Sequence, residues 1–216
     1  KVDQLAKYKF AGSDDAIQNL IAENLRDENT FNVGDCLLES LGKFLPIDPT
    51  EDAGEYWILT IHRNFNADNQ DKLKEIFEAL KESKKDFIFP CHPRTRKNLP
   101  DVPKNIKVID PVGYKEFLSL LVNSAGVITD SGGVQKEAYW MMKRQIIVRE
   151  STEYPEIIES GWGKLCNSKD KILEAFNDFP LDIEKHEMFY GDGTTNEKID
   201  KILRQKLEGG NIEKET

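Results

Sequence analysis

The sequence has few cysteines, no long apolar run and no excess of positive charge, and each absence excludes a class of protein. Its three cysteines, in a chain of 216 residues, are odd in number, widely spaced and form no Cys-x-x-Cys pair. They indicate neither a disulfide framework nor a zinc site, and a reducing cytoplasm is the expected location. No apolar stretch approaches the roughly 20 residues that a membrane-spanning helix needs.

The chain carries a formal net charge of −9, from 39 acidic and 30 basic residues. General nucleic-acid binding needs a basic face, so this charge argues against it but leaves room for a local pocket that holds a phosphorylated small molecule. The amino terminus has no signal-peptide shape and no initiator Met, and it opens in what looks like the middle of an element. We therefore expect a fragment of a longer protein.

What the sequence does contain is a regular alternation of apolar runs and helical patterns. The runs that predict strands lie at residues 30–33, 56–61, 86–90, 106–109, 125–128 and 145–148. Helical spacing of apolar side chains marks residues 13–25, 68–83, 115–123, 154–159, 168–176 and 196–206, and another helix ends near residue 45. Strands that alternate with helices indicate an α/β fold with a doubly wound parallel sheet.

One segment joins a buried strand to a glycine turn. The apolar run at 125–128 ends in Asp-Ser-Gly-Gly, and Gln135, Glu137 and Ala138 then begin a helical pattern. Such a turn leaves the first N–H groups of the helix free to meet a phosphate, which the helix dipole favours. Glu137 could accept hydrogen bonds from sugar hydroxyls. A plainer reading, in which Ser131 merely caps the helix, stays open at this point.

Polar and charged side chains follow five of the expected strands at the point where each strand ends. In an open parallel sheet these carboxyl ends meet at one edge, where ligands bind. Convergence of two of the three histidines and three arginines on that edge is hard to explain by solvation of loops alone. The clusters are His62-Arg63, Cys91-His92-Pro93-Arg94, Pro111-Val112-Gly113, Ser131-Gly132-Gly133 and the segment 149–153.

Together these segments resemble the UDP-N-acetylglucosamine 2-epimerase family, specifically its C-terminal domain. The signature Asp-Ser-Gly-Gly-(Ile/Val)-Gln-x-Glu-Ala is matched at 130–138, and Arg-x-x-Thr-Glu-Arg-Pro-Glu, apart from one position, at 149–156. Thr-x-His-Arg is matched at 60–63, Pro-x-His at 90–92 and Tyr-Gly-Asp-Gly at 190–193. Their order and spacing agree over nearly the whole chain, so the set is specific although each motif alone is weak.

The resemblance implies a glycosyltransferase-B-like architecture, in which two Rossmann-like domains enclose a nucleotide-sugar cleft and this chain holds the C-terminal one. We expect residues 1–50 to form a domain-crossover helix, strand and linker that pack on a UDP-binding Rossmann-like domain at 51–208. A charged tail follows at 209–216. The missing N-terminal domain is where the family keeps its acidic general acid/base residues.

The family inverts C2 of UDP-N-acetylglucosamine by anti elimination of UDP and its re-addition, which gives UDP-N-acetylmannosamine. A hydrolysing branch releases N-acetylmannosamine instead. The resemblance implies no metal and no other cofactor. It also implies a UDP-sugar as partner, no nucleic acid and no membrane, and it leaves open whether the full-length enzyme is a homodimer.

The resemblance assigns one catalytic residue and eight substrate-binding residues. His62 looks like the catalytic histidine beside the leaving diphosphate. Elimination concentrates charge on UDP, so backbone N–H groups and a cationic or hydrogen-bonding side chain would stabilise the departing group. The substrate-binding residues are Ser131, Gly132 and Gly133 as the phosphate cradle, Glu137 as the ribose ligand, Phe117 at the uracil pocket, and Arg63, His92 and Arg149 in the cleft.

The chain departs from the family pattern in three places. His-Arg is followed by Asn64-Phe65-Asn66 where an acidic residue and Asn are common, the second arginine of the later signature is Tyr154, and Lys136 stands where an acid is usual. These departures bear on substrate identity and full activity more than on UDP binding. Three alternatives stay open: a UDP-sugar glycosyltransferase of the same architecture, a hydrolysing 2-epimerase and a non-catalytic UDP-sugar binding module.

Overall fold

The computed structural model describes residues 1–45, 54–179 and 186–207. Residues 46–50, the last part of the expected 1–50 segment, lie outside these ranges, and so does the expected tail at 209–216. The chain divides into two compact units: a crossover unit of residues 1–45 and 187–216, and a sheet unit of residues 46–186. None of the helices in the described ranges has the length and apolarity to cross a membrane.

The sheet unit is built on six parallel strands in the order β5-β4-β3-β6-β7-β8. Counted from the first strand of this unit, that is the strand order of a dinucleotide-binding Rossmann fold, whose topological switch point lies between β3 and β6. All but β8 lie where apolar runs predicted strands. The strands are β3(Tyr56–Thr60), β4(Asp86–Pro90), β5(Ile106–Ile109), β6(Gly126–Thr129), β7(Arg144–Ile147) and β8(Gly163–Leu165).

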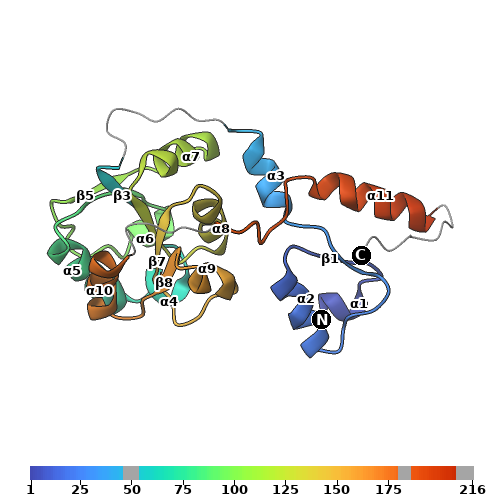
Figure 1. The fold of residues 1–216 in the computed structure, drawn as a ribbon. Helices are drawn as coiled ribbons and strands as arrows, with labels where there is room; N and C mark the ends of the chain where they lie inside the picture. The colour runs from blue at the N-terminus through green and yellow to red at the C-terminus, as the bar shows by residue number, and fades with distance from the viewer. Residues whose placement is uncertain (46–53, 180–185, 208–216) are drawn as a thin grey trace. The chain divides into compact units, whose positions relative to one another are not determined.

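Helices cover both faces of this sheet. α5(Gln70–Glu82) and α10(Lys169–Asp178) lie side by side on one face (Figure 1). Their apolar side chains join the larger core. α7(Tyr114–Asn123) and α8(Gly132–Trp140) supply the smaller core on the opposite face. α5, α7 and α10 were predicted from the spacing of their apolar residues and α8 from the pattern that follows the glycine turn, and the doubly wound sheet is confirmed.

Alternation along the strands explains how one sheet serves two cores. In β3, Trp57 and Leu59 face the larger core, whereas Ile58 between them faces the smaller one. Successive side chains of a strand point to opposite faces, so a strand covered on both sides reads as a continuous apolar run. This is the reason that apolar runs, rather than alternating patterns, marked the strands in the sequence.

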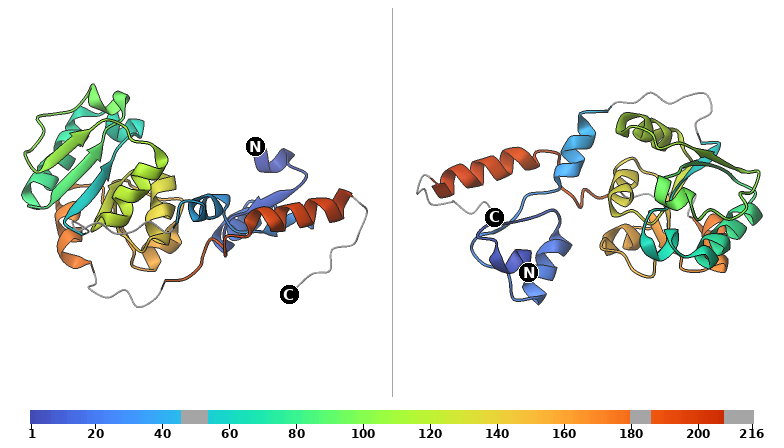
Figure 2. Two further views of the ribbon diagram at one scale, coloured as in Figure 1. Left: turned by 90° about the horizontal axis from the view of Figure 1, so that it is seen from above. Right: turned by 180° about the vertical axis from the view of Figure 1, so that it is seen from behind.

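The crossover unit contains two short parallel strands, β1(Lys9–Ala11) and β2(Thr30–Asn32). α11(Thr195–Leu207) runs beside them (Figure 2), and its Lys206 ammonium lies 5.8 Å from the centre of the Phe31 ring. The early helices α1(Val2–Leu5), α2(Asp14–Ala22) and α3(Cys36–Gly42) complete the described part of the unit.

The Tyr-Gly-Asp-Gly motif packs against the turn that follows β2. The amide of Asp35 donates to the carbonyl oxygen of Tyr190 at 2.9 Å. Gly34 has a φ of +84°, and a Cβ there would lie 2.8 Å from the same oxygen. Only glycine tolerates both the positive φ and the close approach. Two motifs from opposite ends of the chain therefore hold each other in one unit.

Candidate functional site

Asp130, just after β6, ties together the ends of three neighbouring strands. Its buried carboxylate accepts hydrogen bonds from the amides of His62 (3.1 Å) and Arg63 (3.0 Å), which follow β3. The side-chain amide of Asn66 donates to Asp130 at 3.1 Å and to the carbonyl of Val148, after β7, at 2.9 Å. Three of the five strand ends at which polar clusters were expected are therefore joined by one carboxylate.

Asp130 and Asn66 were not among the predicted site residues. Both were visible as part of matched or partly matched motifs, since Asp130 opens the Asp-Ser-Gly-Gly signature and Asn66 follows His-Arg. Their partners are backbone amides and carbonyls of other strands, and no local pattern identifies such long-range acceptors. Short helices in these loops, α4(Asn64–Ala67), α6(Pro93–Arg96) and α9(Pro155–Glu159), supply the turns; α4 and α6 were not predicted.

The His62 ring lies at the boundary between the buried network and solvent. Its Nδ1 atom is 3.3 Å from Oδ1 of Asp130, and 45% of the side chain is exposed. One side of the ring is thus oriented by a buried carboxylate, while the rest can meet a ligand. A histidine held in this way can donate a hydrogen bond or carry a positive charge towards a group above the sheet.

α8 begins without a side-chain cap. Ser131 occupies the N-cap position, but its side chain accepts no hydrogen bond from the first turn, and its own amide donates to Oγ1 of Thr129 at 2.9 Å. By contrast, Ser13, Asn69 and Ser168 each accept such a bond at the starts of α2, α5 and α10. The plain capping role for Ser131 is therefore wrong, and Gly132 and Gly133 open the helix uncapped.

Glu137 lies inside α8 with 5% of its surface exposed. Burial raises the pKa of its carboxyl, while a hydrogen bond from Tyr114 and the charge of Lys136 oppose this rise. Tyr114 is the first residue of α7, so this contact joins the two helices on the smaller core. Phe117 on α7 was a predicted site residue, but Tyr114, which lies one turn earlier on the same helix, was not. Phe117 itself packs against the smaller core.

Two arginines near the edge share an acidic neighbour. Arg149, which follows β7, binds Glu153 through two hydrogen bonds of 2.6 and 2.7 Å. The hydrogen bonds from Arg149 are the main cause that lowers the pKa of the Glu153 carboxyl, and the charge of Arg63 lowers it further. The negative charge of Glu153 thus interacts with both arginines. Part of the positive charge at this edge is therefore already paired with a carboxylate.

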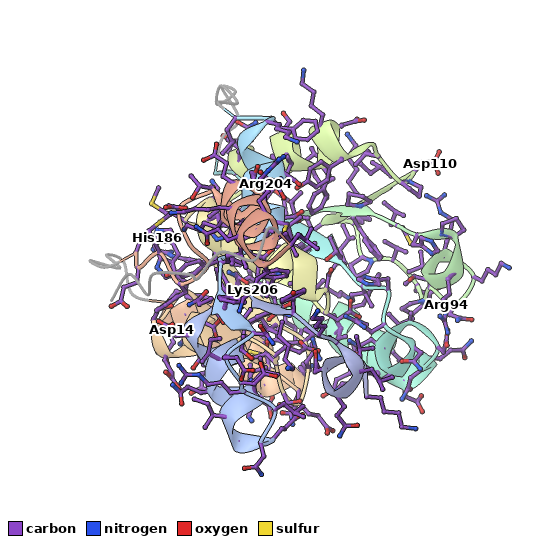
Figure 3. All side chains as sticks on the ribbon, turned by 90° about the vertical axis from the view of Figure 1, so that its right-hand side faces the viewer. Asp14, Arg94, Asp110, His186, Arg204 and Lys206 are labelled. Atoms are coloured by element: carbon purple, nitrogen blue, oxygen red, sulfur yellow. The ribbon has the colours of Figure 1, made fainter. Side chains whose placement is uncertain are left out.

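His92 has a local structural role. It is the N-cap of α6, and its Nδ1 accepts from the amide of Arg94 at 3.2 Å. Figure 3 labels Arg94 and Asp110 in this region; Nε of Arg94 lies 3.0 Å from Asp68, and Arg96 lies 2.9 Å from Asp110. No contact of the His92 side chain with the Asp130 network is seen among the described residues, although both lie at the same edge of the sheet.

Comparison with known proteins identifies the family of this chain. The family model for UDP-N-acetylglucosamine 2-epimerase matches residues 1–204. The chain belongs to the UDP-N-acetylglucosamine 2-epimerase family. The resemblance of the motifs is thereby confirmed.

Relatives of this epimerase-family chain are found in archaea and bacteria. A UDP-N-acetylglucosamine 2-epimerase homolog of Methanococcus maripaludis is 36% identical over 94% of the chain and 62% of that protein. A UDP-2,3-diacetamido-2,3-dideoxy-D-glucuronate 2-epimerase of Pseudomonas aeruginosa is 34% identical over 93% of the chain and 60% of that protein. The chain therefore spans about three fifths of the length of these relatives.

Solved structures of the family have the same fold. One is the Methanocaldococcus jannaschii UDP-GlcNAc 2-epimerase, crystallised with UDP-GlcNAc and UDP. The match covers 92% of this chain and 61% of the chain of that enzyme, with 34% sequence identity and a TM-score of 0.83. This confirms the predicted Rossmann-like sheet as part of a glycosyltransferase-B-like architecture.

Proposed function

We propose that this chain is the UDP-binding part of a 2-epimerase that interconverts UDP-N-acetylglucosamine and UDP-N-acetylmannosamine. The observation that carries the proposal is the start of α8. An uncapped helix N-terminus with two glycines lies at the switch point of a Rossmann sheet, and a buried carboxylate follows within the same helix. That combination suits a nucleoside diphosphate, whose phosphates meet the helix N–H groups while Glu137 accepts from ribose hydroxyls.

In the proposed reaction the bond between C1 of the sugar and the UDP oxygen breaks, and negative charge gathers on the departing diphosphate. The amides of Gly132 and Gly133 and the Arg149 guanidinium stabilise that charge, and the exposed side of the His62 ring donates to it. Each group is held by the fold before the reaction begins, which is the condition for electrostatic stabilisation of a transition state. The proton at C2 is moved by residues of the N-terminal domain.

The crossover unit supports the proposal of a further domain. Among its described residues the sheet has two strands of three residues each, and a two-stranded sheet is marginally stable on its own. We therefore propose that strands of the N-terminal Rossmann-like domain extend this sheet in the full-length protein.

The three cysteines are free thiols, which fits the expected reducing cytoplasm.

The identity of the sugar is a separate question, because the Pseudomonas relative is named for a different UDP-sugar at similar identity. Full-length protein should therefore be mixed with UDP-N-acetylglucosamine, and with UDP-2,3-diacetamido-2,3-dideoxy-D-glucuronate, without any acceptor. Conversion to the C2 epimer supports the proposal for that sugar, whereas release of the free sugar indicates the hydrolysing branch. No reaction without an acceptor, followed by transfer when one is added, would indicate a glycosyltransferase.

The 216-residue chain provides a second test. Calorimetric titration should detect weak UDP binding, because the cradle and Glu137 are present. The same chain should not epimerise, because the acid/base residues are expected in the N-terminal domain. Epimerisation by this chain alone, or a complete lack of UDP binding by the folded chain, would contradict the proposal.

A further inference from the structure

Two of the residues that depart from the family pattern are in contact with each other. The Nζ atom of Lys136 lies 5.2 Å from the centre of the Tyr154 ring, which is within the range of a cation–π contact. Lys136 belongs to α8 and Tyr154 is the N-cap residue of α9. The lysine and the tyrosine therefore form one structural unit that joins two helices, and neither is an isolated substitution.

The same tyrosine ring packs on the first residue of α8. A Cβ atom at Gly132 would lie 3.3 Å from Cε2 and 3.4 Å from Oη of Tyr154. Lys136 stands four residues after Gly132, so the two share a face of the helix. Side chains on a helix lean towards its N-terminus. The Lys136 side chain is thus directed back to the start of α8, where the Tyr154 ring meets it.

Each member of this pair interacts electrostatically with a residue of the proposed ligand site. The charge of Lys136 acts on Glu137, whose pKa is raised by burial and lowered in part by Tyr114 and Lys136. The hydrogen-bonded Glu153 raises the pKa of Arg149, and the nearby Tyr154 adds to that rise. Lys136 is accordingly close enough to interact with the residue proposed for the ribose, and Tyr154 with an arginine proposed for the diphosphate.

We propose that Lys136 and Tyr154 form a phosphate-positioning pair, in which the Tyr154 ring holds the Lys136 ammonium at the start of α8, beside the diphosphate of a bound nucleotide. The inference rests on the proposed function, because it takes the start of α8 as the diphosphate site. A lysine is a flexible point charge, and holding it in advance reduces the entropy lost when the ligand binds. The pair therefore favours UDP over uridine, which has the same base and ribose but no phosphate.

The test is a set of titrations on the 216-residue chain, with UDP followed by calorimetry and uridine by NMR shift titration. Lys136→Gln and Tyr154→Leu should each weaken UDP binding by about two- to fivefold, the range expected for one cation–π contact or one charge at a helix end. Both should weaken uridine binding clearly less than UDP binding, because uridine lacks the diphosphate. Tyr154→Phe keeps the ring and should bind UDP as the unmodified chain does. The double variant Lys136→Gln/Tyr154→Leu should be no weaker than Lys136→Gln, because the ring acts through the lysine.

Thermal unfolding of each variant shows whether the fold is kept. If folded Lys136→Gln binds UDP as well as the unmodified chain, the pair has no role in phosphate binding and the proposal is wrong. Equal losses for UDP and uridine would also overturn it, since they would mean that the pair only supports the shape of α8. Glu137→Gln separates this proposal from the proposed function. If Glu137→Gln loses UDP affinity while Lys136→Gln does not, the nucleotide site stands and the pair is rejected; if the unmodified folded chain does not bind UDP, both fail.

Discussion

Asp130 and Glu137 lie on either side of one glycine turn, with 0% and 5% of their surfaces exposed, yet their surroundings differ. Asp130 accepts from two backbone amides and one side-chain amide, so its charge is compensated within the protein. The pKa of Glu137 is raised because burial outweighs the hydrogen bond from Tyr114 and the charge of Lys136. A compensated buried carboxylate is structural, whereas an under-compensated one beside a helix start is suited to a ligand.

The comparison predicts a division of labour between the two sides of the turn. The Asp130 side orients His62, Arg63 and the neighbouring loops, so changes there should affect stability and the rate of the reaction. The Glu137 side faces the proposed ribose, so changes there should affect nucleotide affinity and its pH dependence. Four substitutions test this division.

His62→Ala in the full-length enzyme should have the largest effect. A group that meets charge only as the bond to UDP breaks acts on the transition state, so kcat should fall roughly 10²–10³-fold with little change in KM. Steady-state kinetics with UDP-N-acetylglucosamine measure both constants. A raised KM with nearly unchanged kcat would instead assign His62 to ground-state binding. Unfolding curves must accompany the kinetics, because lost stability alone also lowers activity.

Asp130→Ala should lower the free energy of unfolding by roughly 2–4 kcal/mol, because it removes a buried acceptor and leaves amide donors unpaired. Urea unfolding followed by tryptophan fluorescence measures this free energy for the sheet unit. All three tryptophans, Trp57, Trp140 and Trp162, belong to that unit of residues 46–186. The matched control is Asp110→Ala. Its side chain is 89% exposed and pairs with Arg96 at the surface, so about 1 kcal/mol or less is expected. Equal losses in both variants would remove the distinction drawn for Asp130.

Glu137→Gln should weaken UDP binding by roughly tenfold, the value of one hydrogen bond to a charged acceptor. It should not lower stability near neutral pH. The raised pKa means that the folded chain binds the proton more tightly than the unfolded chain, so ionised Glu137 costs stability as pH rises through the window above its ordinary pKa. Calorimetry and urea unfolding measure the two effects. Glu116→Gln, an exposed carboxylate in the first turn of α7, is the control and should change neither.

Tyr114→Phe should have the smallest effect, a loss of roughly two- to fivefold in UDP affinity, because one hydrogen bond that orients Glu137 is removed. Tyr114 also opposes the rise of the Glu137 pKa. Without the Tyr114 hydroxyl that pKa should rise further. As the solution is acidified, the variant should therefore lose UDP affinity at a higher pH than the unmodified chain does. Titrations across the acidic range measure this midpoint. An unchanged midpoint would mean that Tyr114 does not control Glu137.

Much of the fold followed from local patterns in the sequence. Five strands of the sheet unit were predicted because a strand covered on both faces is apolar throughout, and α5 and α10 because their apolar residues recur at helical spacing. β8 and β1 were not predicted: each has three residues, too few for a period to show, whereas the equally short β2 was marked by the Gly34-Asp35 turn that follows it. α4 and α6 have four residues each and were missed for the same reason.

The candidate site was only partly visible in the same way. The glycines and Glu137 stand close together in one segment, and sequence spacing could therefore place them on one helix start. Tyr114 and Asn66 were not found, because each acts on a carboxylate in a distant part of the chain. The contact of Lys136 with Tyr154 was equally invisible, although both residues had been noted as departures from the family pattern.

By itself the sequence determined the class of fold, the edge of the sheet at which polar groups gather, and the family, because apolar periodicity and motif spacing are local properties of the chain. The tertiary structure alone decided what each buried group does. Whether a carboxylate is compensated depends on donors brought to it from other strands and helices, as Asn66 is brought to Asp130 and Tyr114 to Glu137. Those donors come from residues far apart in the sequence, and only folding places them within hydrogen-bonding distance.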